Sequence, residues 1–225
     1  MKANFLLINK PKDWTSHDVV GYIRKSQPKK TKVGHAGTLD PFATGLLIVG
    51  VGRDATKRID EFKNMPKTYI ATVKLGSTSD TYDSEGKISL QNSNLKFDKK
   101  EVKTVLKSFF GKQKQIPPMY SAKKINGQKL YDLARKGIEI ERKPSEIEIY
   151  KIKLLKFDQK NNILKIKTEV STGTYIRTLA HDIGQKLSCG AYCEELERTK
   201  IGKYKVKKAV GPKDLDTKKI PFIHI

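Results

Sequence analysis

The sequence lacks long hydrophobic runs, a cysteine framework and enough acidic residues to balance its basic ones. Its 225 residues include two cysteines, Cys189 and Cys193, with no second pair or histidine couple nearby. That spacing excludes a zinc cage and a disulfide framework and favours two free thiols. No apolar run approaches the ~20 residues that a membrane span needs. At the N-terminus, lysines follow a short apolar patch, so no signal peptide is expected.

The shortage of acid is the strongest compositional signal. The chain carries 46 lysines and arginines against 24 aspartates and glutamates, a formal net charge of +22. Such an excess indicates a polyanionic partner, with RNA, DNA and anionic membrane as the candidates. A lysine-rich, solvated surface without a partner is the alternative. A hydrophobic content of 37% is high enough for a folded core. We therefore expect a cytoplasmic, polyanion-binding globular protein.

Hydrophobic periodicity predicts interleaved strands and helices without regular βαβ spacing, which favours an α+β fold with a mixed, mainly antiparallel sheet flanked by helices. A phase slip between Ile149 and Ile152 predicts a bulge in one strand. The expected strands are 5–9, 46–52, a half-buried 67–76, 145–157, 163–170 and a short 192–199. Expected helices are 17–27 with Ser16 as its cap, 53–62, 98–110 and 174–187. Residues 112–143 form a basic excursion from the sheet, with a short amphipathic piece at Leu130–Ala134.

One glycine-rich stretch, "GHAGTLDPFATG" at residues 34–45, holds a single aspartate. Gly37 and Gly45 permit a sharp turn, and Pro41 biases Asp40 toward extended backbone. The apolar run after Gly45 anchors the loop, so Asp40 is presented from a fixed bend. Aspartates in turns often only stabilise the turn. His35 and Asp40 as metal ligands is a further reading, but no third ligand of suitable spacing lies nearby.

Several motifs, in order along residues 5 to about 200, resemble those of the TruB family of pseudouridine synthases. They are "LLINKPKDWTSHDVV", "VGHAGTLDPFATGLLIVGVGRDATK", "KTYIATVKLGSTSDTYDSEG", "QIPPMYSAKKINGQKLYDLARKG", "STGTYIRTLAHDIG" and "CGAYCEELERT". The resemblance implies the pseudouridine-synthase fold, with residues 112–143 as a thumb-like insertion that grips RNA. It also implies conversion of uridine to pseudouridine in tRNA, at uridine 55 of the T-arm loop.

The resemblance assigns the reacting groups. Asp40 is the expected nucleophile, attacking C1′ or C6 of the uridine, and the sequence leaves these two open. Arg177 matches the arginine that pairs with this aspartate. Asp83 resembles an acidic residue of the active-site network, and Lys10 with Pro11 matches a motif that braces the catalytic loop from behind.

The resemblance also assigns the groups around the target base. Tyr69 matches a tyrosine that stacks on the base, although a strand tyrosine also serves as core. Tyr175 and Leu196 fall where the family lines the base pocket. His35 matches a histidine that occupies the space of the flipped base. Because the reaction is a redox-neutral isomerisation, no metal or cofactor is implied.

Two residues depart from the family pattern: Ala36 replaces a frequent threonine, and Glu197 stands where arginine is usual. We expect one catalytic domain over 1–225, without the C-terminal PUA-type domain that many relatives carry, acting on tRNA as a monomer with no obligatory protein partner. A guide-RNA-dependent subunit of the related archaeal and eukaryotic branch is one alternative. A non-catalytic RNA-binding or tRNA-folding protein is the other.

Overall fold

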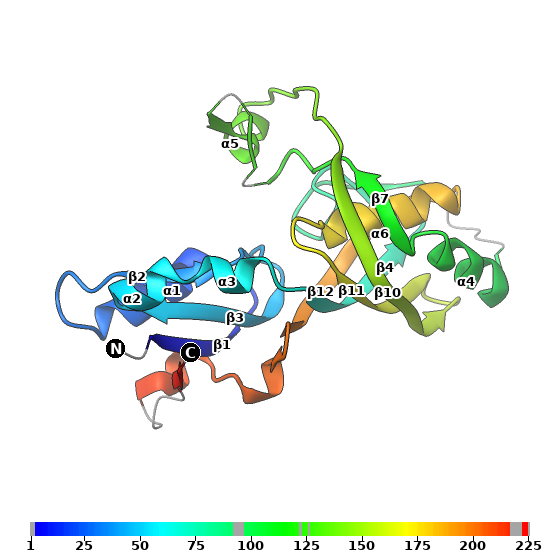
Figure 1. Ribbon diagram of the computed structural model, residues 1–225. Helices are drawn as coiled ribbons and strands as arrows, with labels where there is room; N and C mark the ends of the chain where they lie inside the picture. The colour runs from blue at the N-terminus through cyan, green and yellow to red at the C-terminus, as the bar shows by residue number, and fades with distance from the viewer. Residues whose placement is uncertain (1–2, 92–96, 122, 126, 217–221, 225) are drawn as a thin grey trace. The chain divides into compact units, whose positions relative to one another are not determined.

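The computed structural model describes residues 3–91, 97–121, 123–125, 127–216 and 222–224. The chain divides into two compact units, of which unit 1 is Met1–Ile70 with Leu196–Ile225 and unit 2 is Ala71–Glu195. Two strands pass from one unit to the other, β4 (Lys67–Leu75) and β12 (Ala191–Ile201) (Figure 1). Unit 1 is therefore built from both ends of the sequence.

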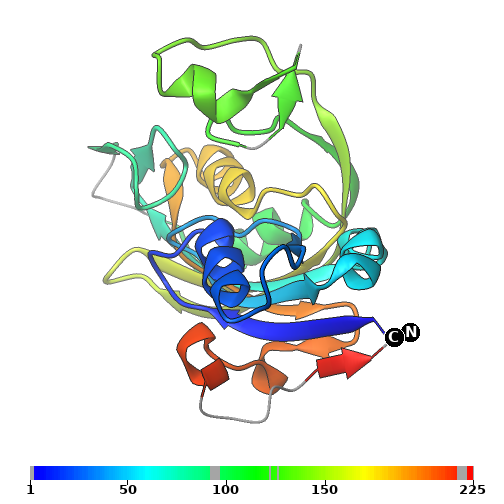
Figure 2. The same cartoon turned by 90° about the vertical axis from the view of Figure 1, so that its left-hand side faces the viewer.

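Unit 1 contains a sheet in the order β14-β1-β3-β12, with β2 also pairing with β3 and β13 with β12. β3 and β12 run parallel, with Arg198 opposite Gly45, whereas β1 is antiparallel to both β3 and β14. Figure 2 shows β14 beside β1. The further elements are β1 (Asn4–Lys10), α1 (Ser16–Lys25), β2 (Val33–Ala36), β3 (Thr44–Val51), α2 (Arg53–Lys57), α3 (Asp60–Lys63), β13 (Tyr204–Lys205), η1 (Val206–Lys208), η2 (Pro212–Asp216) and β14 (Phe222–His224).

Strand β1 contributes to a hydrophobic core on each of its faces. Phe5 and Leu7 belong to a cluster that includes Phe62 of α3. Leu6 and Ile8 belong to a second cluster, which includes Val19, Val20 and Ile23 of α1. Side chains alternate across a strand, so burial of both faces requires a continuous apolar run. This explains why the predicted strand at 5–9 shows no polar alternation.

Unit 2 contains the strand order β4-β11-β10-β7 and two small hairpins, β5-β6 and β8-β9. Figure 1 shows β10 as the long strand beside β7. The elements are β5 (Ser77–Ser79), β6 (Ile88–Leu90), α4 (Lys99–Lys107), β7 (Gly111–Gln115), β8 (Lys124–Ile125), β9 (Gln128–Lys129), α5 (Leu130–Ala134), β10 (Ser145–Asp158), β11 (Ile163–Val170) and α6 (Ile176–Lys186). The mixed, mainly antiparallel α+β architecture is the one predicted.

Three local predictions in unit 2 are confirmed. The register between β10 and β11 shifts between Ile149 and Lys151, where a bulge was expected, and a second shift follows Leu154. Helix α4 starts after Asp98, whose side chain accepts from the amides of Lys100 and Glu101. The helical piece of the excursion is α5, at the predicted residues. The side chains of Lys124 and Lys129 in this excursion lie outside what the structure describes.

Other local predictions are wrong. Thr15, not Ser16, caps α1, because the Thr15 side chain accepts from the Asp18 amide while the Ser16 hydroxyl binds Leu39. Strand β4 is buried on both faces except at Ile70 and Lys74, since it is an inner strand and not a half-exposed one. The predicted helix over 53–62 is two short helices, α2 and α3. The short strand at 192–199 is the longer β12.

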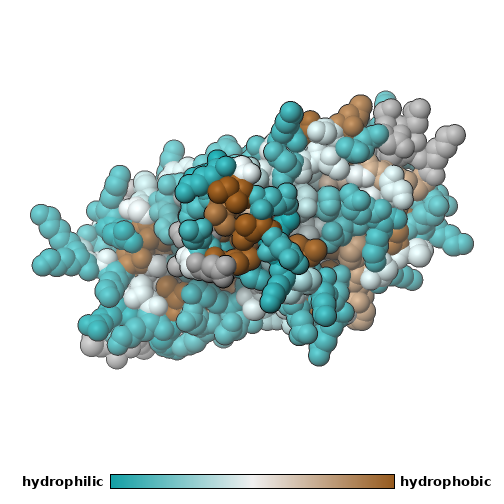
Figure 3. All heavy atoms as spheres, turned by 90° about the horizontal axis from the view of Figure 1, so that it is seen from above, coloured by the Kyte–Doolittle hydropathy of each residue, from teal (hydrophilic) through white to brown (hydrophobic). Residues whose placement is uncertain are grey.

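The surface agrees with the composition. Most of the face seen in Figure 3 is hydrophilic, with apolar residues in small groups. Cys189 and Cys193 are free thiols and buried, as expected. Within the described ranges, no helix combines the length and apolar character needed to cross a bilayer.

Candidate active site

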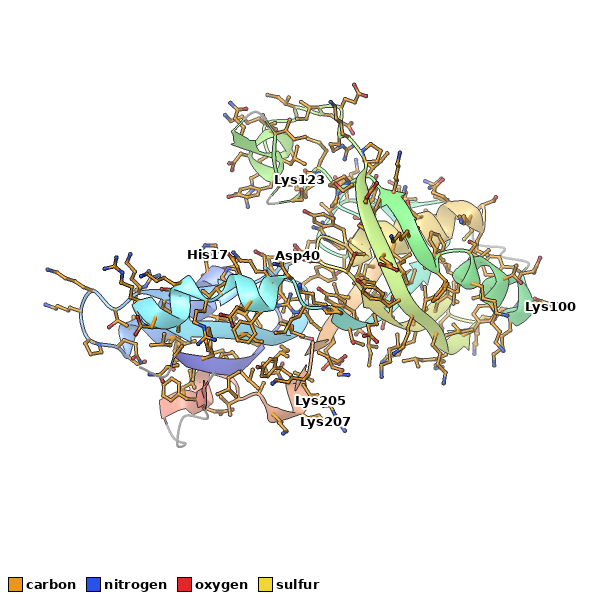
Figure 4. All side chains as sticks on the ribbon, in the orientation of Figure 1. His17, Asp40, Lys100, Lys123, Lys205 and Lys207 are labelled. Carbon is orange, nitrogen blue, oxygen red and sulfur yellow. The ribbon has the colours of Figure 1, made fainter. Side chains whose placement is uncertain are left out.

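The single aspartate of the glycine-rich stretch lies in the loop that joins β2 to β3. The Ala43 amide donates to the Asp40 carbonyl at 3.1 Å, which closes a four-residue turn with Pro41 at its second position. Asp40 is half-buried, whereas its neighbours Leu39 and Phe42 are each only 3% exposed. Figure 4 labels Asp40 in this loop. The two apolar neighbours anchor the turn, and Asp40 between them stays partly exposed.

Lys10 holds one side of this loop from the end of β1. Its side chain is fully buried, and its ammonium donates to the carbonyls of Pro11 at 2.8 Å, Trp14, and Pro41 at 3.1 Å. Pro41 follows Asp40 directly. A buried ammonium is stable only when its protons are hydrogen-bonded, and these carbonyls meet that need. Lys10 therefore ties the turn to the chain between β1 and α1.

Ser16, the first residue of α1, holds the residue before Asp40. The Leu39 amide donates to its hydroxyl oxygen at 2.9 Å. The hydroxyl in turn donates to the Leu39 carbonyl at 3.2 Å. Together with Lys10, this side chain fixes the backbone on both sides of the catalytic candidate.

Arg198 of β12 supports the loop from the opposite end of the sequence. It is 1% exposed, and its guanidinium donates to the carbonyls of Leu46 at 2.8 Å, Gly37 at 3.0 Å and Thr38 at 3.3 Å. A planar guanidinium can serve several acceptors at fixed angles, which a lysine cannot. Sequence reasoning missed this residue. Because strand side chains alternate, its position two residues after Leu196 placed it on the same inward face.

Gly45 makes the close approach of β3 and β12 possible. Its φ is +104°, and a Cβ there would lie 2.4 Å from the Arg198 carbonyl oxygen. Only glycine fits this combination of left-handed backbone and contact. The glycine at the end of the loop is thus needed for the position of Arg198 as well as for the turn.

His35 lies on β2, just before the loop, and its ring contacts His17 of α1. The two ring centroids are 5.4 Å apart, in an edge-to-face arrangement at 85°. Burial, and then the nearby charge of His17, lowers the pKa of His35 from 6.5 to about 4. Its Nδ1 is buried and has no hydrogen-bond partner within the described part of the chain. His35 is therefore a neutral ring near neutral pH.

Tyr69 and Leu196 are core residues of unit 1. Tyr69 on β4 is 8% exposed, and Leu196 on β12 is 6% exposed. The Leu196 carbonyl accepts a hydrogen bond of 3.4 Å from the Thr44 hydroxyl, at the start of β3. The sequence reading that a strand tyrosine here serves as core is consistent with this burial.

A second group of predicted residues comes together in unit 2, around Arg177 at the start of α6. The guanidinium lies 3.1 Å from the Asp83 carboxylate, and each side chain is 3% exposed. It also donates to the carbonyls of Thr81 at 3.0 Å and Tyr120 at 2.9 Å. Tyr120 belongs to the excursion at 112–143, so one buried cation joins α6, the acidic turn and the base of the excursion.

The Asp83 carboxylate also accepts hydrogen bonds from two donors of its own turn. Besides Arg177, it accepts from the Thr81 hydroxyl at 2.6 Å and from the Glu85 amide at 3.0 Å. Several charge-assisted bonds to one buried carboxylate fix its orientation. The Asp83 carboxylate is therefore held in a fixed orientation toward Arg177.

Tyr82 strengthens the same turn with a contact that the sequence did not reveal. Its φ is +65°, unusual for a bulky residue, and its ring stacks on His181 at 4.1 Å and 18°. His181 and Arg177 are four residues apart on α6, so they share a helix face. That face holds the turn at two points, by charge and by stacking.

Tyr175 caps the N-terminus of α6 and is half-buried. The Gln115 side chain pairs with its backbone in both directions, accepting from the amide at 2.8 Å and donating to the carbonyl at 3.0 Å. Gln115 ends β7, so the start of α6 is attached to the sheet of unit 2.

The predicted residues thus fall into two groups. Unit 1 holds Lys10, His35, Asp40, Tyr69 and Leu196; unit 2 holds Asp83, Tyr175 and Arg177. Among the described residues, no group of three or more histidines, cysteines, aspartates or glutamates is placed to hold a metal ion. The first group offers a half-buried aspartate on a braced loop, and the second offers a buried, oriented cation.

Comparison with known proteins gives the family. A model described as TruB family pseudouridylate synthase (N terminal domain) matches residues 24–176. A second, described as tRNA pseudouridylate synthase B C-terminal domain, matches residues 177–220. The tRNA pseudouridine synthase B of Mycoplasma mobile is 50% identical over 220 residues, which are 98% of this chain and 76% of the relative. That of Parabacteroides distasonis is 47% identical over 219 residues, with 95% of this chain and 92% of the relative covered.

Solved structures agree with the family models. A chain in a Cbf5-Nop10-Gar1 complex matches with a TM-score of 0.70 and 27% identity, over 92% of this chain and 51% of that one. A chain in an H/ACA RNP bound to a substrate RNA containing 2'-deoxyuridine matches with a TM-score of 0.67 and 26% identity, over 94% and 52%. This chain spans about half the length of those solved chains. With the family models and the curated relatives covering most of the sequence, the chain belongs to the TruB family of pseudouridylate synthases.

Proposed function

We propose that this protein converts uridine to pseudouridine in tRNA, at uridine 55 of the T-arm loop, with Asp40 as the nucleophile. The observation that carries the proposal is the support given to one carboxylate. Lys10, Ser16 and Arg198 hold the backbone on both sides of Asp40, and no other aspartate or glutamate occurs in residues 34–45. Rigid support of a single reactive group is typical of a catalytic loop.

One carboxylate suffices for this chemistry. Asp40 attacks C1′ or C6 and forms a covalent bond, the N1–C1′ bond breaks, and the base turns. The base rejoins C1′ of the ribose through C5, and the bond to Asp40 breaks, which restores the carboxylate. N1 then gains a proton and C5 loses one, so electrons and atoms balance without a cofactor. A glycoside hydrolase needs a second carboxyl group to direct water. Here the detached base is itself the returning nucleophile, and water must be kept out.

The cation in unit 2 is proposed to act on this carboxylate. Arg177 is held by Asp83 and by two carbonyls, so its orientation is fixed before substrate arrives. A guanidinium beside Asp40 would hold the carboxylate directed at the sugar or base. Asp83 then serves as a positioning residue for Arg177.

Aromatic and apolar side chains are proposed to receive the flipped base. Removing a stacked base from an RNA loop costs a few kcal/mol, and stacking on protein rings offsets part of that cost. Tyr69 provides a ring for the base, and Tyr175 and Leu196 line the pocket around it. His35 fills the vacated space as a neutral ring, because its pKa is lowered to about 4 by burial.

The excursion at 112–143 is proposed to be the RNA-gripping thumb. Its described basic side chains include Lys112, Lys114, Lys123, Arg135 and Arg142. Phosphate contacts from such a segment supply affinity that depends on salt rather than on sequence. We further propose one catalytic domain that acts alone as a monomer in the cytoplasm.

The test uses purified protein and an unmodified, protein-free tRNA transcript with no guide RNA. Wild type should form pseudouridine at position 55, mapped chemically, whereas Asp40→Asn should form none. Asp13→Asn is the matched control, because Asp13 touches the same loop only through its amide, 2.9 Å from the Pro41 carbonyl. Asparagine also tolerates its φ of +65°.

Each outcome bears on one statement. Product from Asp40→Asn would refute the nucleophile assignment. Tight tRNA binding with no product from wild type would favour the non-catalytic RNA-binding alternative. Product at another uridine alone would overturn the assignment of position 55.

A further inference from the structure

An unusual group of lysines faces outward from the β10–β11 hairpin in unit 2. In the antiparallel register, Lys153 lies directly opposite Lys167, and Lys156 lies directly opposite Lys165. All four side chains are exposed. We call Lys153, Lys156, Lys165 and Lys167 the lysine ladder.

The ladder occupies one face of the hairpin by regular alternation. On β11, Leu164, Ile166 and Thr168 are buried, and the two lysines between them point the other way. The bulges keep the lysines of β10 in phase with them, because the register shifts after Ile149 and again after Leu154. Without the second shift, which lies between them, Lys153 and Lys156 would fall on opposite faces of the strand.

Like charges directly opposite each other in a sheet repel and weaken the pair. The chain offers little to offset this repulsion. Lys156 contacts Asp158 at 3.2 Å, and one step along the hairpin Lys151 contacts Glu169 at 3.2 Å. Within the described ranges, Lys153, Lys165 and Lys167 form no ion pair with a carboxylate. The hairpin therefore carries an uncompensated positive charge along its outer face.

We propose that the lysine ladder is a docking surface for the phosphate backbone of RNA. Cross-strand lysines start ~5 Å apart, and successive rungs follow at about 7 Å along the strands. Their flexible ammonium groups can thus meet several phosphates in a row. The bulge residues Tyr150 and Leu155 are 36% and 45% exposed. An exposed ring among lysines suits nucleic acid, because bases or sugars can pack on it.

This inference rests on the proposed function only in taking RNA as the ligand. None of the ladder residues belongs to the proposed active site, so the surface adds affinity and orientation, not chemistry. Bound phosphates would also relieve the repulsion between the lysine pairs. The proposal therefore predicts that neutralising these lysines weakens RNA binding and leaves the stability of the folded protein unchanged or higher.

The test compares two triple variants that lose the same charge. Lys153→Thr/Lys165→Thr/Lys167→Thr neutralises the lysines without a carboxylate partner and keeps residues that suit a strand. Lys99→Gln/Lys103→Gln/Lys107→Gln is the control on α4, where the three lysines are also exposed. A third variant, Lys153→Arg/Lys165→Arg/Lys167→Arg, keeps the charge of the ladder.

Binding of an unmodified tRNA transcript is measured by fluorescence anisotropy over a range of salt concentrations. The threonine variant should bind at least about tenfold more weakly near ~0.1 M salt, and its slope of log affinity against log salt should fall by ~2. The arginine variant should bind like wild type. Thermal unfolding of the threonine variant should occur at the wild-type temperature or above it.

The proposal fails if the threonine variant keeps the wild-type affinity and slope, or if the α4 control loses as much as the ladder does. The second result would mean that only net charge matters. Failure of the proposed function is separate, because it would appear as absence of pseudouridine from wild type whatever the binding curves show.

Discussion

The guanidinium of Arg177 and the carboxylate of Asp83 form an ion pair of 3.1 Å in which each side chain is 3% exposed. Each charge stabilises the other in this buried site, because removing one partner of a buried ion pair is strongly destabilising. Their pairing also fixes the donors that Arg177 turns toward Thr81 and Tyr120. The stability of unit 2 and the readiness of the proposed catalytic cation are therefore linked.

Replacing the acidic partner of this ion pair should strongly destabilise the protein. Asp83→Asn leaves the Arg177 charge buried, and we expect a loss of about 3 kcal/mol in the free energy of unfolding, measured with urea. Adding Arg177→Met should cost less than the sum of the single changes, by 1 kcal/mol or more, since the two residues are coupled. Additive losses would show that the pair is not coupled.

Arg198 should prove to be a positioning residue for the catalytic loop. Arg198→Met leaves the carbonyls of Gly37, Thr38 and Leu46 unsatisfied, and we expect about 2–4 kcal/mol of destabilisation and a lower kcat with little change in KM. Arg198→Lys should recover only part of both, because a lysine carries its donors on one atom and cannot reproduce the planar fork with which Arg198 reaches Leu46, Gly37 and Thr38. Glu197→Gln next to it is the control. An unchanged kcat in folded Arg198→Met would contradict the role.

Substitutions at two glycines can distinguish the cost of backbone strain from the cost of a steric clash. Gly45 has a φ of +104° and Gly52 a φ of +89°, but only a Cβ at Gly45 meets another atom, the Arg198 carbonyl oxygen at 2.4 Å. Gly52→Ala should cost about 1 kcal/mol through strain alone. Gly45→Ala should cost several times more and push β12 away, with loss of activity. Equal costs in urea unfolding would rule out the contact as the cause.

The pH dependence of stability should show His35 directly. Burial lowers the pKa of His35 from 6.5 to about 4. Between these values the unfolded chain binds the proton and the folded chain does not. The stabilisation is therefore complete above about 6.5 and is lost as the pH falls toward 4. We expect His35→Gln to reduce the fall in the free energy of unfolding between pH 7 and pH 4.5 by about 1–2 kcal/mol. Urea unfolding at pH 7, 5.5 and 4.5 measures this.

Asp182 should act with the opposite sign over a similar range. Burial raises its pKa from 3.8 to about 6, and Lys186 opposes this shift. The folded chain then holds the proton that the unfolded chain releases, so this contribution is complete below about 3.8 and is lost as the pH rises through 6. Asp182→Asn should remove this loss of stability at high pH. The variant should therefore be more stable than wild type at pH 7, with a smaller difference at pH 4.5. A parallel shift at both pH values would disprove it.

Removing the tip of the thumb should abolish tRNA binding without unfolding the sheet. Lys123 bonds to Ser145 at 2.6 Å, and Arg142 bonds to the Pro117 carbonyl at 3.4 Å. A deletion between Lys123 and Arg142, closed with glycines, keeps these contacts and the bond between Arg177 and Tyr120. We expect at least about a hundredfold weaker tRNA binding in a filter-binding titration at fixed salt, with unchanged circular dichroism. Unchanged affinity would disprove the gripping role.

Local sequence signals predicted the local structure well. Asp98 and Glu101 form the capping box that starts α4, and the phase slip after Ile149 marks a real bulge. Signals of this kind need only neighbouring residues. The assignment of Ser16 as the cap of α1 failed for the same reason, because Ser16 is engaged by Leu39, 23 positions away, and Thr15 is the cap.

The contacts within each of the two residue groups could not be predicted from the sequence. Motifs singled out Arg177 and Asp83 separately, but only the fold shows that they touch. Arg198 binds residues that lie more than 150 positions away in the sequence. Its acceptors at Gly37 and Leu46 are backbone carbonyls, so the side chains of these residues give no indication of the contact. Burial of β4 on both faces likewise depends on which strands become its neighbours.

The dependence of the Asp40 loop on Arg198 sets an order for its assembly. During synthesis, residues 34–45 leave the ribosome long before β12 does, and until then the carbonyls of Gly37, Thr38 and Leu46 lack the guanidinium that binds them. Closing so long a connection is a late, entropically costly step. A nascent chain therefore cannot hold Asp40 in its final geometry before β12 has been made, and the proposed activity begins only after that point.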